Sequence, residues 1–265
     1  MAESIHASAV VAPGARVGQG CTVGPYCVVG PQVTLGDGCV LHSHVVLEGK
    51  TSLGPGCEVF PFACIGGRTQ DLKYTGGESA VEIGAKTTLR EYVTVHAATT
   101  EGGVTRIGDN CSILAYCHIA HDCVLKDRVI MSNGTMLAGH VTVEDAVVFG
   151  GMAGVHQFVR IGTMAMVSAT SKVVQDVVPF CLVDGNPAQP VTVNRIGMER
   201  NGRDAETIRT VSTAYRILFR TNLKLEDALE RLRAEFRGVP DVQTMATFVA
   251  ESERGVARPR GHREL

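Results

Sequence analysis

The sequence contains no tryptophan, and aromatic residues make up only 5% of its 265 positions. It also lacks an excess of charge of either sign, since the formal net charge is −2, which argues against a large nucleic-acid interface. No apolar run approaches the length of a membrane span, and residues 1–10 lack the basic region and apolar core of a signal peptide. We therefore expect a cytoplasmic globular protein with no nucleic-acid partner and no integral membrane segment.

A period of six residues dominates the sequence instead. An aliphatic residue stands at almost every sixth position from Ile5 to Val173, often followed by glycine as in Val17-Gly18. A helix has no six-residue period, whereas short strands joined by tight turns do, and a fixed hexapeptide period indicates a parallel β-helix. Three hexads would close a triangular coil, with the aliphatic side chains buried because one coil cannot cover its own apolar face.

Most of the nine cysteines share one place in this period, and none forms a CxxC pair. Seven stand four residues after the aliphatic position: Cys21, Cys27, Cys39, Cys57, Cys111, Cys117 and Cys123. A recurring slot for a small buried residue suits free cysteine, which packs as a small hydrophobe. We therefore expect reduced structural thiols in a reducing compartment.

The period is interrupted in three places, which divide the chain. Polar, glycine-rich stretches near 67–80 and 98–105 indicate two loops that leave a corner of the prism. Such loops could be tolerated insertions, or they could carry functional residues. After Val173 the spacing becomes helical, and Asp204 is a plausible N-cap. We predict a β-helix over residues 1–189, an α-helical domain over 190–252 and a disordered basic tail over 253–265.

Five of the nine histidines fall on one strip of the predicted prism. The hexads that begin at Ile119, Leu137 and Val155 are 18 residues apart, so they should stack on one wall at roughly 4.8 Å per step. These hexads and their neighbours carry His96, His118, His121, His140 and His156, with His118 at the corner leading into the wall. Three imidazoles could hold zinc, or one could act as a general base while the others bind polar or anionic groups. Asp122, which follows His121 directly, could orient such a base.

The segment from His118 to Cys123, HIAHDC, resembles the UDP-N-acetylglucosamine acyltransferases. Further matching segments occur in that family's order: Gln70 to Tyr74, Val95-His96, Leu137 to His140, Gly150 to Met152, Val155 to Phe158 and Gly185-Asn186. The resemblance implies an all-β left-handed parallel β-helix followed by a small α-helical C-terminal domain, although the general rule for parallel crossovers favours the right hand. It also implies a homotrimer with active sites between subunits.

The resemblance implies an activity as well. The family transfers a 3-hydroxyacyl group from acyl carrier protein to the glucosamine 3-hydroxyl of UDP-N-acetylglucosamine, at the opening of lipid A synthesis. By analogy His121 is the general base, and the Gly139 N–H stabilises the oxyanion. The acyl carrier protein thioester is then a co-substrate, and we expect no metal and no other cofactor.

Substrate contacts are implied by the same resemblance. The positions that match sugar, phosphate or nucleotide contacts are Gln70, Asp71, Lys73, His96, His118, His140, His156, Gln157, Asn194 and Arg200. The sequence departs from the family near the last two, at Ile196 and Asn201. Ala169, with Met166 nearby, would limit the length of the acyl chain. A related hexapeptide N-acyltransferase, a zinc-dependent hexapeptide enzyme and a purely structural β-helix are the alternatives.

Overall fold

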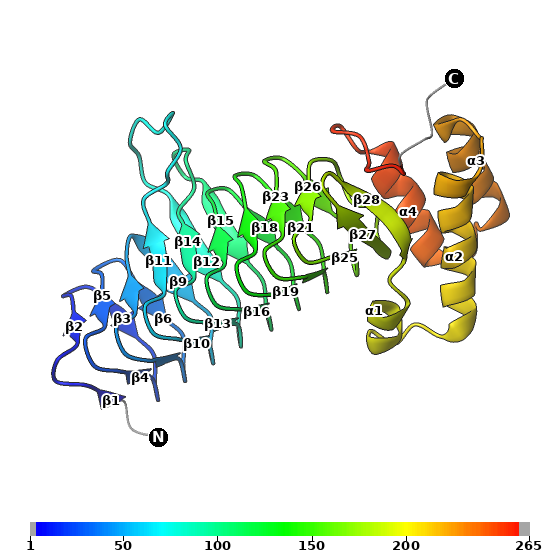
Figure 1. Ribbon diagram of the computed structural model, residues 1–265. Coiled ribbons are helices and arrows are strands. Elements are labelled where there is room, and N and C mark those ends of the chain that lie inside the picture. Colours follow the sequence, from blue (N-terminus) through cyan, green and yellow to red (C-terminus); the bar gives the residue numbers. More distant parts are fainter. Residues whose placement is uncertain (1–3, 260–265) are drawn as a thin grey trace.

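Residues 4–259 are described by the computed structural model, in which short strands wind into a long three-walled prism with helices at its C-terminal end (Figure 1). Sheet A contains β1 Ser4–Ile5, β4 Thr22–Val23, β7 Val40–Leu41, β10 Glu58–Val59, β13 Thr88–Leu89, β16 Ser112–Ile113, β19 Ile130–Met131, β22 Val148–Phe149, β25 Met166–Val167, β27 Cys181–Gly185 and β28 Ala188–Val193. Sheet B contains β2 Val10–Val11, β5 Val28–Val29, β8 Val46–Leu47, β11 Cys64–Gly67, β14 Thr94–His96, β17 His118–Ile119, β20 Met136–Leu137, β23 Gly154–Val155 and β26 Lys172–Val173. Sheet C contains β3 Arg16–Val17, β6 Thr34–Leu35, β9 Lys50–Leu53, β12 Ala80–Ile83, β15 Val104–Ile107, β18 Val124–Leu125, β21 Thr142–Val143 and β24 Arg160–Ile161.

The register of sheet B confirms the stacking predicted from the six-residue period. Ile119 pairs with Leu137, and Leu137 pairs with Val155, both in parallel. These side chains are almost fully buried inside the prism, where each coil covers the apolar face of the next. The seven cysteines of the repeat are also buried, and all nine cysteines of the chain are free thiols. The expectation that these seven are buried structural residues is therefore confirmed, and their reduced state stays a prediction.

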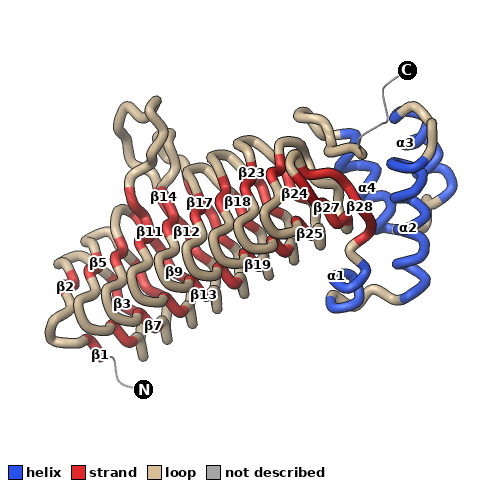
Figure 2. Tube along the Cα trace, viewed as in Figure 1, coloured by secondary structure: helices blue, strands red, loops and turns tan. Residues whose placement is uncertain are grey.

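One corner of the prism differs from the other two. We call the turns from sheet B to the next strand of sheet C the B–C corner; they include residues 121–122, 139–140 and 157–158. Loops 68–79 and 97–103 replace two of these turns and project from the prism (Figure 2). A hydrogen bond of 3.0 Å between the hydroxyls of Thr69 and Thr99 joins the two loops.

Four helices follow the prism: α1 Arg195–Arg200, α2 Ala205–Arg220, α3 Leu225–Glu235 and α4 Pro240–Ala250. Asp204 caps α2 as predicted, by accepting a 2.7 Å hydrogen bond from the Thr207 N–H. The helices share a second hydrophobic core, which includes Met198 of α1, with Phe180 and Cys181 at the end of the prism. No helix among residues 4–259 is long and apolar enough to cross a membrane.

The C-terminal region differs from the sequence prediction in three ways. The hairpin of β27 and β28 carries strand structure to Val193, past the predicted boundary at residue 189, and α1 was not foreseen. The predicted disordered tail is wrong for its first residues, because Val256 is buried and the Ala257 N–H donates to the Asp176 carbonyl at 2.9 Å. Residues 260–265 of that predicted tail lie outside the described residues.

Candidate active site

All five histidines of the predicted strip lie on sheet B or at the B–C corner. His96 ends β14, whereas His121, His140 and His156 occupy the turns after β17, β20 and β23. His118 does not stand at a corner, as the sequence suggested, but begins β17 on the wall itself. The reason is that each short strand includes the residue before the buried aliphatic, and that residue faces outward.

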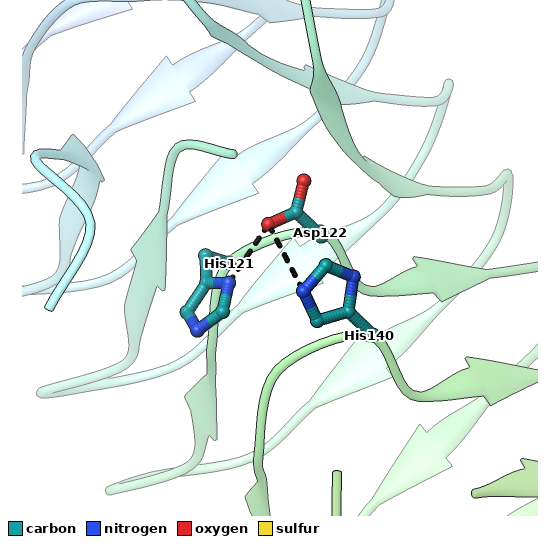
Figure 3. Close-up of side chains that lie close together, drawn as sticks. All are labelled: His121, Asp122 and His140. Atoms are coloured by element: carbon teal, nitrogen blue, oxygen red, sulfur yellow. Dashed lines mark hydrogen bonds and ion pairs between the residues drawn. The ribbon is translucent and has the colours of Figure 1, made fainter. Parts of the chain in front are cut away.

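His121 and Asp122 form the most constrained pair on this corner (Figure 3). The His121 Nδ1 lies 2.8 Å from the Asp122 Oδ2, which also accepts a 3.1 Å hydrogen bond from the Thr99 N–H. A carboxylate can only accept, so Nδ1 carries the proton and Nε2 is left as a free base. Their side chains are 15% and 12% exposed, so the pair is enclosed but reachable. This arrangement suits a general base with a fixed tautomer.

His140 lies beside this pair from the next coil. Its Nε2 is 3.7 Å from the Asp122 Oδ2, and its ring meets the His121 ring edge-on with 5.2 Å between centroids (Figure 3). Phe158, one coil further, stacks on His140 at 4.5 Å and holds that ring in place. The positive φ values of Asp122, His140 and Phe158, between 59° and 64°, align these side chains along the corner.

The same three polar residues raise the question of a metal ion. Within the part of the chain that the structure describes, His121, Asp122 and His140 form the one group whose potential ligand atoms all lie within 4.8 Å of one another. Two imidazoles and a carboxylate are a possible zinc ligand set. However, the Asp122 Oδ2 already accepts from both His121 and Thr99, so a cation would have to displace existing hydrogen bonds. A third imidazole, which the sequence analysis considered for zinc, is not part of the group.

Gly139 packs directly against the free nitrogen of His121. A Cβ atom at Gly139 would lie 2.4 Å from the His121 Cε1 and 2.6 Å from its Nε2, so no larger residue fits without moving the base. The Gly139 N–H donates to no protein acceptor among residues 4–259. Proline, which has no N–H, occupies the same place in the hexad at residues 25, 31, 55 and 61. An unpaired N–H beside a general base is therefore available to a substrate oxygen.

His96 and His118 form a second, more buried pair on sheet B. Burial lowers the pKa of both rings, that of His118 to about 4, and in each case a neighbouring histidine adds to the effect. Their rings meet edge-on at 5.0 Å, and the His118 Nδ1 lies 2.8 Å from the Thr94 hydroxyl. The buried Nδ1 of His96 has no hydrogen-bond partner within the described range, residues 4–259. Both rings are thus neutral near pH 7, and His96 keeps a polar atom that a ligand could satisfy.

The loop and turn residues of the predicted site lie on the same corner but have different environments. The Asp71 Oδ1 accepts from the Lys73 N–H at 2.9 Å and so shapes loop 68–79, while the side chains of Gln70 and Lys73 are exposed. Gln157 is exposed in the turn after β23. Gln70, Lys73 and Gln157 are thus accessible from solvent at this corner.

Four predicted residues are not brought to this corner. Asn194 is buried and caps α1, since its Oδ1 accepts from the Gly197 N–H at 3.0 Å and its Nδ2 donates to the Met164 carbonyl at 2.8 Å. Arg200 is exposed at the end of α1. The two residues expected to limit the acyl chain, Met166 and Ala169, lie in β25 and in the following turn, between sheets A and B.

Three residues that the sequence analysis did not single out contact the site. Phe158 could have been found by arithmetic, because it stands three residues after Val155 as His140 stands three after Leu137. Thr99 could not, because it acts through its backbone N–H. Arg254, whose guanidinium lies 2.9 Å from the His156 Nδ1, is 98 residues away in the sequence.

Known proteins resemble the chain in sequence and in structure. A model described as UDP-N-acetylglucosamine O-acyltransferase, domain 2, matches residues 176–257, and the bacterial transferase hexapeptide model matches residues 14–49 and 105–139. An acyl-[acyl-carrier-protein]–UDP-N-acetylglucosamine O-acyltransferase of Alkalilimnicola ehrlichii is 51% identical over 255 residues, covering 96% of this chain and 99% of that protein. The corresponding enzyme of Anaeromyxobacter dehalogenans is 47% identical over 256 residues, covering 96% of this chain and 100% of that protein.

Solved structures extend the similarity to the fold. The UDP-N-acetylglucosamine O-acyltransferase of Moraxella catarrhalis superposes with a TM-score of 0.92 at 37% identity, covering 96% of this chain and 99% of that one. This match spans the prism and the helices, and it confirms the predicted left-handed β-helix with a small α-helical end. The chain therefore belongs to the acyl-[acyl-carrier-protein]–UDP-N-acetylglucosamine O-acyltransferase family.

Proposed function

We propose that this chain transfers a 3-hydroxyacyl group from acyl carrier protein to the glucosamine 3-hydroxyl of UDP-N-acetylglucosamine, in lipid A synthesis. The names of the relatives identify acyl carrier protein as the donor and UDP-N-acetylglucosamine as the acceptor. The observation that carries the chemistry is the His121–Asp122 pair beside the unpaired N–H of Gly139. A base and an oxyanion donor in one place are what acyl transfer to a hydroxyl requires.

The reaction then proceeds in two steps. The His121 Nε2 takes the proton of the sugar hydroxyl as its oxygen attacks the thioester carbonyl, and the oxyanion that forms accepts from the Gly139 N–H. The intermediate collapses by breaking the C–S bond, and the departing thiolate takes the proton back from the His121 imidazolium. Asp122 stabilises that imidazolium through Nδ1. A preorganised donor such as the Gly139 N–H is typically worth about 3 kcal/mol in the transition state.

Binding is assigned to the remaining polar residues of the corner. Loop residues Gln70, Asp71 and Lys73 and the turn residues of the next coils would hold the sugar and phosphates, with the neutral His96 and His118 as uncharged partners. This assignment of binding roles is supported by the exposure of the loop residues and by the buried Nδ1 of His96, which is unpaired among the described residues.

We further propose a homotrimer of prisms packed side by side, with sites between subunits. The resemblance assigns Asn194, Arg200, Met166 and Ala169 to the site, yet in one chain they lie away from the histidines. A neighbouring copy could supply them. Sedimentation equilibrium should give three times the chain mass of 28.1 kDa.

His121→Ala tests the general base. We expect the rate of acyl transfer to fall by about 10²-fold or more, with the fold and the oligomeric state unchanged. His42→Ala is a matched control, because His42 lies on sheet A's side of the prism and contacts Glu58. A near wild-type rate in folded His121→Ala would remove His121 from this role.

No metal takes part in the proposed reaction, since Asp122 is already engaged by two donors. We expect full activity after dialysis against a chelator and no stoichiometric zinc in the active protein. Activity that disappears with the chelator and returns with zinc would make His121, Asp122 and His140 metal ligands instead.

A further inference from the structure

The segment that follows α4 folds back onto the last coil of the prism, next to His156. We call residues 251–257 the C-terminal strap. Asp176, which is 1% exposed, accepts hydrogen bonds from the Arg160 N–H at 2.8 Å and from the Ser252 hydroxyl at 2.7 Å. Its backbone also pairs with the strap, donating to the Gly255 carbonyl at 3.0 Å and accepting from the Ala257 N–H at 2.9 Å. The strap is therefore held in a defined position.

Arg254 reaches from this strap to His156. Its Nε donates to the Val174 carbonyl at 2.9 Å, and its Nη2 lies 2.9 Å from the His156 Nδ1. A guanidinium only donates hydrogen bonds, so the His156 Nδ1 must accept. The ring is then neutral, and its one proton sits on Nε2.

A competing contact would require the opposite tautomer. The His156 Nδ1 also lies 3.1 Å from the Gln157 carbonyl, to which it could donate only if it carried the proton. One nitrogen cannot serve both partners. The contact with Arg254 is shorter, and a hydrogen bond from a charged donor is about twice as strong as a neutral one. The bond from Arg254 therefore decides the tautomer.

We propose that Arg254 is a positioning residue for the acceptor: it holds His156 as an Nε2–H donor toward an oxygen of the nucleotide sugar. This inference rests on the proposed function. His156 occupies the turn two coils along from that of His121, or roughly 10 Å at the spacing of parallel strands. With the sugar hydroxyl at His121, we place a phosphate oxygen of the same molecule at His156. Phosphate oxygens only accept, so the proton must be on Nε2 for His156 to bind one.

A double-mutant cycle tests whether Arg254 acts through His156. We expect Arg254→Met to raise KM for UDP-N-acetylglucosamine by about tenfold, which corresponds to about 1.4 kcal/mol, with kcat within about twofold and KM for the acyl carrier protein unchanged. In a His156→Ala background the same substitution should have no further effect, because coupled residues are not additive. Arg254→Lys should recover part of the affinity. Equal effects of Arg254→Met in both backgrounds would overturn the proposal.

Two control variants distinguish a positioning role of Arg254 from a contribution of Arg254 to folding. Arg258→Met removes another arginine close to the strap, for which residues 4–259 show no hydrogen bond or ion pair to the site, and it should leave KM unchanged. Ser252→Ala loosens the strap at Asp176 without touching Arg254. If Ser252→Ala lowered Tm as much as Arg254→Met and raised KM equally, the role of Arg254 would be structural only.

A spectroscopic measurement decides the tautomer directly. Imidazole ¹⁵N chemical shifts of wild-type protein should show His156 protonated on Nε2, and Arg254→Met should show a mixture or the Nδ1–H form. A wild-type Nδ1–H form would contradict the inference even if the enzyme is active. A wild-type protein that neither binds UDP-N-acetylglucosamine nor transfers acyl groups to it would contradict the proposed function, while the shifts would still report on Arg254.

Discussion

Aspartates stand at two corners of the same coils, and they do different things there. At the corner leading from sheet C to sheet A, which we call the C–A corner, each aspartate bonds to the backbone of the neighbouring coil. Asp109 Oδ1 accepts from the Ala85 N–H at 2.7 Å, Asp127 from the Asp109 N–H at 2.8 Å and Asp145 from the Asp127 N–H at 3.1 Å. At the B–C corner Asp122 accepts from a backbone group of the preceding coil, the Thr99 N–H, and in addition from a side chain, His121.

The difference comes from one step along the turn. Asp109 and Asp127 stand two residues after the buried aliphatic of sheet C, whereas Asp122 stands three residues after Ile119. The earlier place directs the carboxylate to the preceding coil, where it satisfies an open backbone N–H. The later place brings the carboxylate to the His121 imidazole as well as to the Thr99 N–H. Because Gln157 rather than an aspartate stands two residues after Val155 in the following coil, the Gly139 N–H has no such carboxylate partner. At the C–A corner the carboxylates and backbone N–H groups thus pair with one another, whereas at the B–C corner the Gly139 N–H and the His121 Nε2 stay available for chemistry.

The largest expected effect contrasts Asp122→Asn with Asp127→Asn. The amide at 122 could donate to the His121 Nδ1 and favour the wrong tautomer, so we expect kcat to fall by about 10²-fold with little change in Tm. Asp127→Asn keeps a carbonyl oxygen for the Asp109 N–H and should leave kcat within about twofold. Comparable losses of kcat in both variants, measured by steady-state kinetics, would show that the two corners do not differ as we describe.

A methyl group added at the B–C corner should have the next largest effect. In Gly139→Ala the new Cβ collides with the His121 ring, so we expect kcat to fall by at least about tenfold. Gly154→Ala is the matched control on the same sheet, because a Cβ there meets no atom within 4 Å. The wild-type rate in Gly139→Ala would mean that His121 can move without cost, and would weaken the case for a preorganised base.

The turn between sheets A and B provides a third corner for comparison. If Ala169 ends the acyl groove, Ala169→Met should favour shorter hydroxyacyl chains, since each buried methylene is worth about 0.8 kcal/mol, or roughly fourfold in kcat/KM. Ala169→Gly should be neutral or should favour slightly longer chains. The assay is relative kcat/KM over a series of acyl carrier protein thioesters. An unchanged length profile in an active Met variant would place the end of the groove elsewhere.

The smallest effect concerns stability and pH. Burial lowers the pKa of His118 to about 4 in the folded protein, whereas an unfolded histidine titrates near 6.5. Between these values the unfolded state binds more protons, so the free energy of unfolding should decrease as pH falls from about 6.5 toward about 4. His118→Asn should flatten part of this slope in denaturant titrations. If the free energy of unfolding depended on pH equally in the wild type and in His118→Asn, then His118 would have the same pKa in the folded and unfolded states.

Much of the fold and part of the site followed from the sequence, because a period of six is a local property. It predicted the stacking of Ile119, Leu137 and Val155 and so brought the histidines of three coils to one corner. The two loops do not shift the six-residue register, because Val95 lies 30 residues after Ile65 and Ile119 lies 24 residues after Val95, and both numbers are multiples of six. The general role of each site residue came from family resemblance, and those roles stay predictions.

Tertiary structure alone decided the contacts that join distant segments or depend on the backbone. The bond from the Thr99 N–H to Asp122 depends on how loop 97–103 folds, and the bond from Arg254 to His156 spans 98 residues. Residues 253–257 of the strap were predicted to be disordered because the tail is basic and contains glycine and proline, yet the carboxylate and the backbone of the buried Asp176 supply the partners that order the strap. A repeat determines which residues share a wall, whereas the pairing of polar groups depends on where non-repeating segments meet that wall.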